Sequence, residues 1–141
     1  MKKLLLFMVL LSAFGLQDVY AQKRVGGKML KGYDVIYPFK NGRAKVIKNG
    51  KMGFIDMQGE EIIKPEFDNI MPFEKGVARV EKGLLLGLIN EQGEILLDPI
   101  YESITAQKDN LFITSRKGKR GLVKITGTTP DDVEYIVDIR D

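Results

Sequence analysis

The stretch VARVEKGLLLGLINEQGEILLDPIYE, residues 77–102, repeats the pattern of RAKVIKNGKMGFIDMQGEEIIKPEFD, residues 43–68, at an interval of 34 residues. Two sets of glycines and one set of aromatic residues keep the same interval: Gly53, Gly87 and Gly121; Gly59, Gly93 and Gly127; Tyr33, Phe67, Tyr101 and Tyr135. Self-similarity at a fixed period of this length indicates a repeat architecture, in which one small unit is copied and stacked.

Each copy opens with a pattern typical of a β-hairpin. In the first copy Ala44 and Val46 alternate with charged side chains, which predicts a half-buried strand. Asn49-Gly50 follows, and this dipeptide favours a two-residue turn with positive φ at both central positions. The returning strand, around Gly87 in the second copy, is apolar on both faces, which predicts a central strand covered on both sides.

A second turn and a third strand complete the predicted unit. Residues 56–59 and 90–93 place Asp or Asn first and Gly fourth, as in a type I turn whose first side chain accepts backbone N–H groups. The third strand should end at Pro65 or Pro99, since proline lacks the N–H of the ladder. We therefore expect an all-β protein of stacked antiparallel three-stranded meanders, joined by aromatic linkers. Stacking is required because one meander buries too little apolar area to offset about 1.5 kcal/mol of ordering entropy per residue.

The glycines inside the returning strands predict close packing. A strand glycine costs about 0.5–1 kcal/mol relative to alanine, so we expect a neighbouring backbone or aromatic ring to lie over it. The apolar residues beside these glycines should form ladders through the array: Phe54, Leu88 and Leu122, with Ile55, Ile89 and Val123.

The pattern Phe73-x-x-Gly76-x-Ala78-x-Val80, followed by Gly87-Leu88-Ile89-Asn90-x-x-Gly93-x-x-Leu96-Leu97-x-Pro99-x-Tyr101-Glu102, resembles the bacterial WG β-repeat. The resemblance covers about residues 32–127. The family is named for a Trp-Gly pair, and the tryptophan position is here taken by Met52, Leu86 and Arg120. This departure affects any role of the indole and leaves the glycine frame intact.

The resemblance implies a repeat scaffold, often exported, that serves as a binding or structural module without established catalysis or consensus site residues. The third copy departs further from the pattern. Gln107, Asn110 and Val133 stand where the second copy has a phenylalanine, a glycine and a proline. We interpret it as a degraded capping copy, because terminal repeats usually differ from internal ones.

The N-terminal residues predict a secretory signal peptide. Two lysines precede an apolar run over residues 4–11, and residues 19–21 offer a small-residue cleavage site. A membrane anchor is the alternative, but polar residues 17–18 interrupt the stretch before the roughly 20 apolar residues that a span needs. The expected organisation is a cleaved signal peptide, 1–21, and a WG-type β-repeat domain, 22–141. The protein should be exported to the periplasm or beyond, with no transmembrane span after cleavage.

Composition excludes several kinds of chemistry. The chain has 141 residues and neither Cys nor His, which rules out disulfides, cysteine nucleophiles, Ser-His triads and the usual zinc sites. Its net charge is +3, and the charges are spread along the chain, whereas nucleic-acid-binding modules concentrate a basic face. We expect no cofactor and no nucleic-acid partner.

Other candidate sites are explained by turns. Asp56 and Asn90 suggest calcium, but no dense run of acidic oxygens accompanies them, so turn capping is the preferred interpretation. Gly26-Gly27-Lys28 and Gly118-Lys119 lack the surroundings of a phosphate loop. The acidic residues that a glycosidase would need all fall in predicted turns or loop edges: Glu60, Glu61, Glu94, Asp131 and Asp132.

One charge cluster is a candidate site, because four cations crowd a single predicted hairpin tip: Arg116, Lys117, Lys119 and Arg120. Such a tip is ordinarily a solvated turn. It is also suited to an anionic polysaccharide, a lipid headgroup or an acidic protein.

Three functions remain open. The favoured one is a non-catalytic binding or interaction module of the cell envelope or exterior, which contacts an unknown protein or an anionic envelope polymer. The second is a structural envelope component that self-associates through its terminal strands, around Tyr135. The third is a small carboxylate-dependent hydrolase of envelope glycans.

Overall fold

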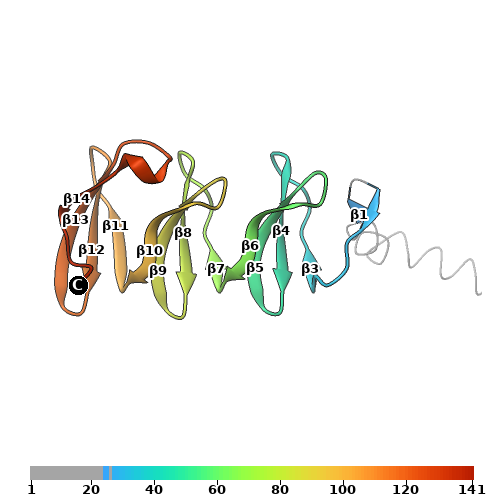
Figure 1. Cartoon of the computed structure of the whole chain (residues 1–141), viewed down its shortest axis with the longest axis horizontal. Coiled ribbons are helices and arrows are strands. Elements are labelled where there is room, and N and C mark those ends of the chain that lie inside the picture. Colours follow the sequence, from blue (N-terminus) through green and yellow to red (C-terminus); the bar gives the residue numbers. More distant parts are fainter. Residues whose placement is uncertain (1–23, 26) are drawn as a thin grey trace, which may run out of the picture. The chain divides into compact units, whose positions relative to one another are not determined.

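The computed structural model describes residues 24–25 and 27–141 (Figure 1). The predicted signal peptide, residues 1–21, lies outside the described residues. The chain divides into two compact units, of which the first ends at Pro65 and the second spans Glu66–Asp141.

The described part of the first unit holds a small and a large sheet. The small sheet pairs β1 (Arg24–Val25) with β2 (Lys28–Met29). The first four-stranded sheet has the order β3-β4-β5-β6. Its strands are β3 (Val35–Ile36), β4 (Arg43–Lys48), β5 (Lys51–Asp56) and β6 (Glu61–Phe67), and the last two residues of β6 belong to the second unit.

The second unit contains two further four-stranded antiparallel sheets. The second sheet has the order β10-β9-β8-β7 and the third has the order β11-β12-β13-β14. Their strands are β7 (Asn69–Ile70), β8 (Val77–Lys82), β9 (Leu85–Asn90), β10 (Ile95–Tyr101), β11 (Ser103–Ala106), β12 (Leu111–Arg116), β13 (Lys119–Ile125) and β14 (Val133–Val137). One 3-10 turn, η2 (Pro130–Asp132), precedes β14.

The all-β prediction is confirmed, but the prediction of three strands in each repeat is wrong, because each sheet has four strands. The segment expected to be an aromatic linker forms a fourth strand in each sheet. In the second sheet Ile70 of β7 pairs with Val80, and in the third Ile104 of β11 pairs with Thr114. Ile70 and Ile104 are buried, so the linker contributes to the core as well as to the ladder.

The expectation that proline ends the third strand is also wrong. Pro65 lies inside β6 and Pro99 inside β10, and both strands continue to the following aromatic residue. These strands lie at the edges of their sheets, where a missing N–H costs no ladder bond. In β10 the register shifts between Leu97 and Tyr101, at the proline.

Both predicted turns form. Asn49 and Gly50 have φ of 51° and 73°, as the two-residue hairpin turn requires. Asp56 accepts bonds at its Oδ1 from the N–H groups of residues 58 and 60, both at 2.9 Å. Asn90 accepts bonds at its Oδ1 from residues 92 and 94 in the same way, at 3.0 and 2.8 Å.

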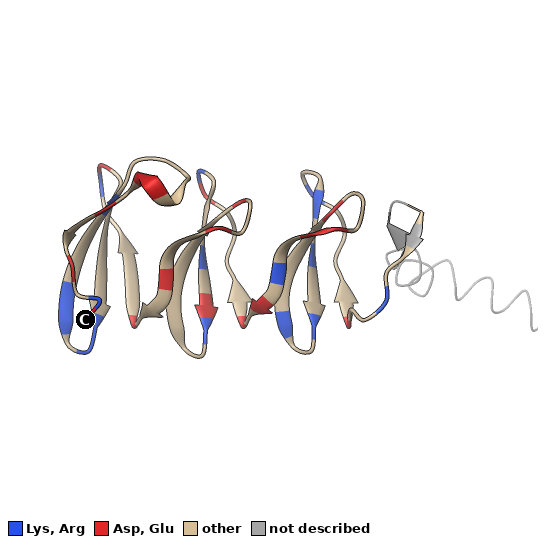
Figure 2. Ribbon diagram, in the orientation of Figure 1, with Lys and Arg blue, Asp and Glu red and all other residues tan. Residues whose placement is uncertain are grey.

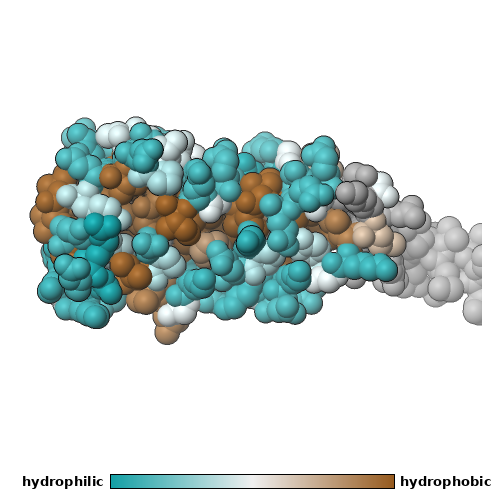
Figure 3. Space-filling model, viewed as in Figure 1, coloured by the Kyte–Doolittle hydropathy of each residue, from teal (hydrophilic) through white to brown (hydrophobic). Residues whose placement is uncertain are grey.

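The hairpin of the second sheet carries a strained apolar residue. Leu84 has φ of 68° and a side chain that is 84% exposed. Figure 3 shows apolar surface protruding where the β8–β9 hairpin bends in Figure 1. A leucine in this left-handed conformation costs about 1–2 kcal/mol, and no burial of its side chain offsets that cost.

Each unit has its own core, made by the inward faces of the hairpins. In the first unit the buried cluster is Ile36, Ala44, Val46 and Ile55. In the second unit one cluster joins residues of both sheets: Leu88, Leu96, Leu97, Tyr101, Ile104, Val123, Ile125 and Ile139. Of the residues expected to form ladders, Ile55, Leu88, Ile89 and Val123 are buried, whereas Phe54 and Leu122 are only half-buried.

The strand glycines mark a close crossing of backbones, as predicted. A Cβ atom on Gly53 would lie 2.4 Å from the carbonyl oxygen of Ile63, and one on Gly87 would lie 2.6 Å from that of Leu97. Both distances are far shorter than real Cβ contacts, and the opposing atoms belong to the backbone. Only glycine therefore lets β6 cross β5 in the first sheet and β10 cross β9 in the second.

The third copy leaves the 34-residue period after β13. Leu97 pairs with Leu88, and Val137 pairs with the equivalent Leu122, so the paired residues of the last strands are 40 apart instead of 34. The difference of six residues lies in the segment 126–132. In this shifted register Tyr135 corresponds to Ile95, so Tyr135 is no true member of the aromatic series.

The crossing survives this shift with different residues. A Cβ atom on Gly121 would meet the carbonyl oxygen of Val137 and the Cγ1 of Ile139, both at 2.9 Å. Ile139 is thus the spatial counterpart of Pro99, a role that the 34-residue spacing assigned to Val133. Thr114 lies beside Gly121 in the position of Val46 and Val80, and among the described residues its buried Oγ1 has no hydrogen-bond partner.

Gly87→Ala should destabilise the second unit by about 2–3 kcal/mol or more, because the methyl group meets backbone atoms of Leu97 and Pro99 that cannot turn aside. Urea denaturation followed by circular dichroism measures the change. Gly83→Asn is the matched control, because its Cβ meets nothing within 4 Å and asparagine tolerates the φ of 58°. An unchanged midpoint for Gly87→Ala would contradict the crossing.

Leu84→Asn should stabilise the second unit by about 1 kcal/mol, because asparagine accepts positive φ at lower cost and no packing is lost. The same denaturation experiment measures the gain. Leu85→Asn, one residue on and half-buried, should bring no gain. Equal effects of the two substitutions would argue against backbone strain at Leu84.

Candidate functional site

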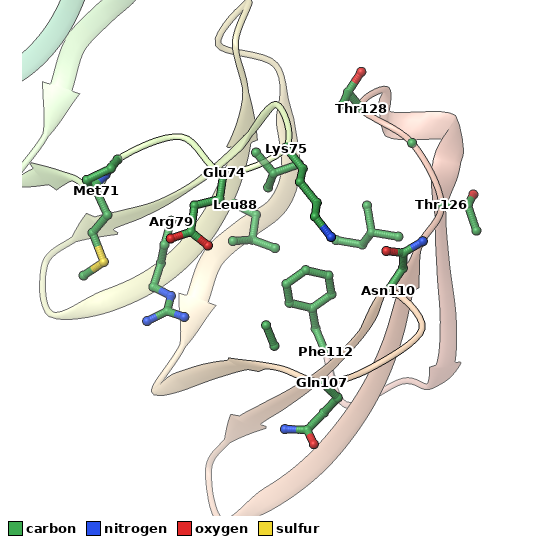
Figure 4. Close-up of a pocket in the computed structure, with 15 residues that line it drawn as sticks. Met71, Glu74, Lys75, Arg79, Leu88, Gln107, Asn110, Phe112, Thr126 and Thr128 are labelled. Atoms are coloured by element: carbon green, nitrogen blue, oxygen red, sulfur yellow. The ribbon is translucent and has the colours of Figure 1, made fainter.

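A pocket of 610 Å³ lies between the second and third sheets, within the second unit. Its apolar floor includes Leu88, Phe112 and Ile125, which belong to the core or pack against it. Figure 4 shows the Phe112 ring in the middle of this space. The full lining is Met71, Pro72, Glu74, Lys75, Val77, Arg79, Leu88, Ala106, Gln107, Asn110, Phe112, Ile125, Thr126, Gly127 and Thr128.

The pocket is lined where the third copy departs from the repeat. Gln107 takes the position of Phe39, whose side chain packs against the core of the first sheet. Phe112 takes the position of Ala44 and Ala78, which are buried. In the third copy the aromatic residue is therefore on the strand instead of in the loop before it, and the loop position carries an exposed amide.

Asn110 adds a second amide without changing the local backbone. It occupies the position of Gly76, and it keeps the left-handed conformation, with φ of 59° against 81° for the glycine. Asparagine is among the few residues that adopt this conformation readily. The turn is therefore retained, while a polar side chain is added to the pocket wall.

The segment 126–132, which contains the six extra residues, forms one rim and is bonded to the second sheet. Asn90 of the second sheet donates a hydrogen bond from its Nδ2 to the carbonyl oxygen of Thr128, at 2.8 Å. Within the segment, Asp132 Oδ2 accepts bonds from the backbone N–H and the Oγ1 hydroxyl of Thr129, at 2.9 and 2.7 Å. These bonds hold the pKa of Asp132 below its usual value.

Two cations and one carboxylate line the pocket. Arg79 lies on β8, and among the described residues its buried Nε has no hydrogen-bond partner. Lys75 is exposed, and Figure 4 shows its side chain extended toward Asn110. Glu74 is the one acidic side chain of the lining. The charge balance of this lining is therefore positive.

The structure separates the four cations of the predicted basic site. They lie at the β12–β13 hairpin, where Figure 2 shows a concentration of basic residues. Arg116 and Lys119 are directly opposite each other and share one face, whereas Arg120 lies on the other face. Lys117 occupies the turn, and Arg116 is half-buried, so the exposed basic surface comprises three side chains.

Acidic residues support the hairpins of the second unit. Glu102 Oε1 accepts a hydrogen bond from the backbone N–H of Lys117 at 3.0 Å, and Asp68 Oδ2 accepts one from that of Gly83 at 2.7 Å. Lys82 forms an ion pair with Glu66 at 3.5 Å. These carboxylates hold the turns and reduce the local positive charge.

The acidic residues considered for hydrolysis do not line the pocket. Glu61 accepts a bond from the Tyr33 hydroxyl at 2.8 Å, and burial together with this bond raises the pKa of Tyr33 to about 12. Glu94 accepts a bond from Asn90, and Asp132 caps its own turn. Glu60 and Asp131 are exposed, and the described residues contain no group of three acidic side chains able to hold a metal ion.

These features define an all-β repeat protein with an inter-sheet pocket. The model of the family described as "WG containing repeat" matches the chain at residues 31–51, 52–83 and 87–119. The chain therefore belongs to the WG containing repeat family. No curated protein and no solved structure matches it. Among the described residues there is no helix long and apolar enough to cross a membrane.

Sequence reasoning missed the pocket, although its signal was present. In the sequence Gln107 and Asn110 look like the decay of a terminal copy, and the exchange of Ala78 for Phe112 has no evident meaning there. All three lie in one pocket. Departures from a repeat that converge on one place are a stronger sign of a site than any of them alone.

Replacing Lys117, Lys119 and Arg120 with glutamine should abolish most retention on an anionic matrix, because it removes the exposed cations of the hairpin. Stability should change by less than about 0.5 kcal/mol per substitution. Salt elution from a sulfonated column measures retention.

A matched control removes the same charge elsewhere, through glutamine at Lys31, Lys40 and Lys64, all exposed. If the two triple variants elute alike, net charge rather than the hairpin governs retention, and the basic site is eliminated.

Proposed function

We propose that this chain is a non-catalytic binding protein of the cell envelope or exterior, and that its ligand or partner occupies the pocket between the second and third sheets. The observation that carries this proposal is that the pocket is lined by residues that depart from the repeat while the backbone of the repeat is kept. The turn of the third copy keeps its backbone at Asn110, and the strand crossing is retained at Gly121, while three nearby positions of the repeat now carry the polar or aromatic side chains that line the pocket: Gln107, Asn110 and Phe112.

The dimensions and lining support binding rather than catalysis. Ligand pockets are typically about 300–1,000 Å³, with an apolar floor and a few polar groups. A carboxylate-dependent glycosidase needs two carboxyl groups about 5–10 Å apart. Glu74 is the one carboxylate in this lining, and of the acidic candidates outside it Glu94 and Asp132 hold turns.

Filling the pocket should abolish partner capture. Ala106 of β11 lines the pocket, so Ala106→Trp should occupy it. The tagged full chain and this variant are incubated with the envelope fraction of the producing cell, and retained components are identified by mass spectrometry. Thr105→Trp is the matched control, because Thr105 is exposed on the same strand and is not part of the lining. Equal capture by all three chains would contradict a role for the pocket.

Export is a separate part of the proposal, supported by the lysines and apolar run of residues 1–21. Expression of the full chain with a C-terminal tag should yield a product whose N-terminus is Gln22, recovered outside the cytoplasm. Intact-mass measurement and fractionation test this. An uncleaved product in the cytoplasm would overturn export and leave the pocket proposal standing.

Self-association remains a second candidate because of β14. This strand is at the edge of the third sheet, and its Ile136 and Val137 are each 48% exposed. Exposed edge strands with apolar side chains pair readily with further strands. Tagged and untagged chains mixed at high concentration should then co-purify, and Ile136→Lys should prevent this. Monomers alone would retire the candidate.

A further inference from the structure

We propose that the pocket between the second and third sheets binds an acidic sugar, a uronic acid residue of a glycan, and that Arg79 and Lys75 supply the positive charges that attract its carboxylate. This inference rests on the proposed function and adds the chemical class of the ligand.

The Arg79 guanidinium is the first reason. Its Nε is buried and has no hydrogen-bond partner among the described residues, although the side chain lines an open pocket. The side chain as a whole is only half-buried, and no acceptor among the described residues holds its Nε, so the guanidinium is available to an acceptor from outside the chain. Arginine binds carboxylates through two parallel hydrogen bonds, which makes a carboxylate the matching group.

Charge balance is the second reason. Arg79 and Lys75 supply two positive charges to the lining and Glu74 supplies one negative charge. No ion pair joins Glu74 to either cation in the part of the chain that the structure describes. The pocket therefore favours an anion over a neutral or cationic ligand.

The remaining lining indicates a sugar as the body of the ligand. Gln107 and Asn110 carry amides that both donate and accept hydrogen bonds, and Thr126 and Thr128 lie on the same rim. Such groups match the hydroxyls of a sugar ring. The Phe112 ring, in the middle of the space in Figure 4, offers a flat apolar surface for a sugar face.

The size of the pocket fits this ligand class. A volume of 610 Å³ is in the range of small-molecule sites and is sufficient for one or two sugar rings. The floor of Leu88 and Ile125 belongs to the core of the second unit, so the pocket is pre-formed. Little ordering is then needed on binding.

Titration calorimetry with the full chain tests the proposal. The probes are digalacturonic acid, its dimethyl ester, and a tripeptide with a free C-terminal carboxylate. We expect the diacid to bind at least roughly tenfold more tightly than the ester, as loss of a charge-assisted hydrogen bond implies. Arg79→Gln and Lys75→Gln should each weaken binding of the diacid and leave binding of the ester unchanged.

Controls keep the outcome decisive. Lys75 is exposed, so Lys75→Gln should fold normally even if Arg79→Gln does not. Lys108→Gln removes one exposed charge outside the lining and should have no effect. Equal binding of diacid and ester, or no effect of Arg79→Gln and Lys75→Gln, would overturn the carboxylate site.

Failure of this inference differs from failure of the proposed function. Tighter binding of the tripeptide, or no binding of any probe at millimolar concentration, would overturn the acidic sugar. If Ala106→Trp still abolished partner capture, the pocket would remain the binding site for another class of ligand. If no probe bound and Ala106→Trp captured partners as the unsubstituted chain does, both the acidic sugar and the role of the pocket in binding would be overturned.

Discussion

The fold depends on a backbone crossing at one glycine in each sheet. Where β10 passes Gly87, the carbonyl oxygen of Leu97 lies 2.6 Å from the place that a Cβ would occupy. Through this approach the edge strand β10 crosses β9, and its last residue, Tyr101, points into the core. Only Glu102 separates β10 from β11, the first strand of the next sheet. The crossing therefore passes the chain from one sheet to the next. It also explains why one buried cluster in the second unit contains residues of two sheets.

The third sheet shows how much can change while this constraint is kept. The register of its last strand is displaced by six residues, yet Val137 and Ile139 lie against Gly121 as Leu97 and Pro99 lie against Gly87. The side chains that replace the repeat pattern are Gln107, Asn110 and Phe112, and the additional segment 126–132 closes one rim. Because glycine and turn residues fix the backbone, the side chains at nearby positions can differ from the repeat without changing the fold. The candidate site occupies those positions.

Local chemistry made most of the fold predictable. Asn49-Gly50 and Asp56 dictate their turns through positive φ and side-chain acceptance, and both turns form as expected. The fourth strand was not predictable from periodicity, because β7 is two residues long and carries no alternation of its own. Its pairing depends on the strand that follows it. Likewise, the strand through Pro99 required knowing that β10 lies at an edge.

The site was less accessible from sequence, for a physical reason. Tyr135 matches the aromatic period in the sequence, but the shifted register pairs it with Val123 and places Arg140 3.7 Å above its ring. The 34-residue spacing alone does not reveal the six additional residues before β14, because the order of the strands in the third sheet is the same as in the other sheets. The basic hairpin was found by composition, but the separation of Arg116 from Arg120 across the two faces follows from the ladder. The pocket arises from two sheets together and has no continuous signature in the chain.

The most direct test of the crossing is native-state hydrogen exchange on the full chain with glycine or alanine at residue 87. Residue 87 lies in the second sheet, and the crossing joins this sheet to the third through one core. The slowest amides of β12 and β13 should therefore lose protection in Gly87→Ala by the same factor as those of β8 and β9. Unchanged protection of β12 and β13, with loss confined to the second sheet, would contradict the account.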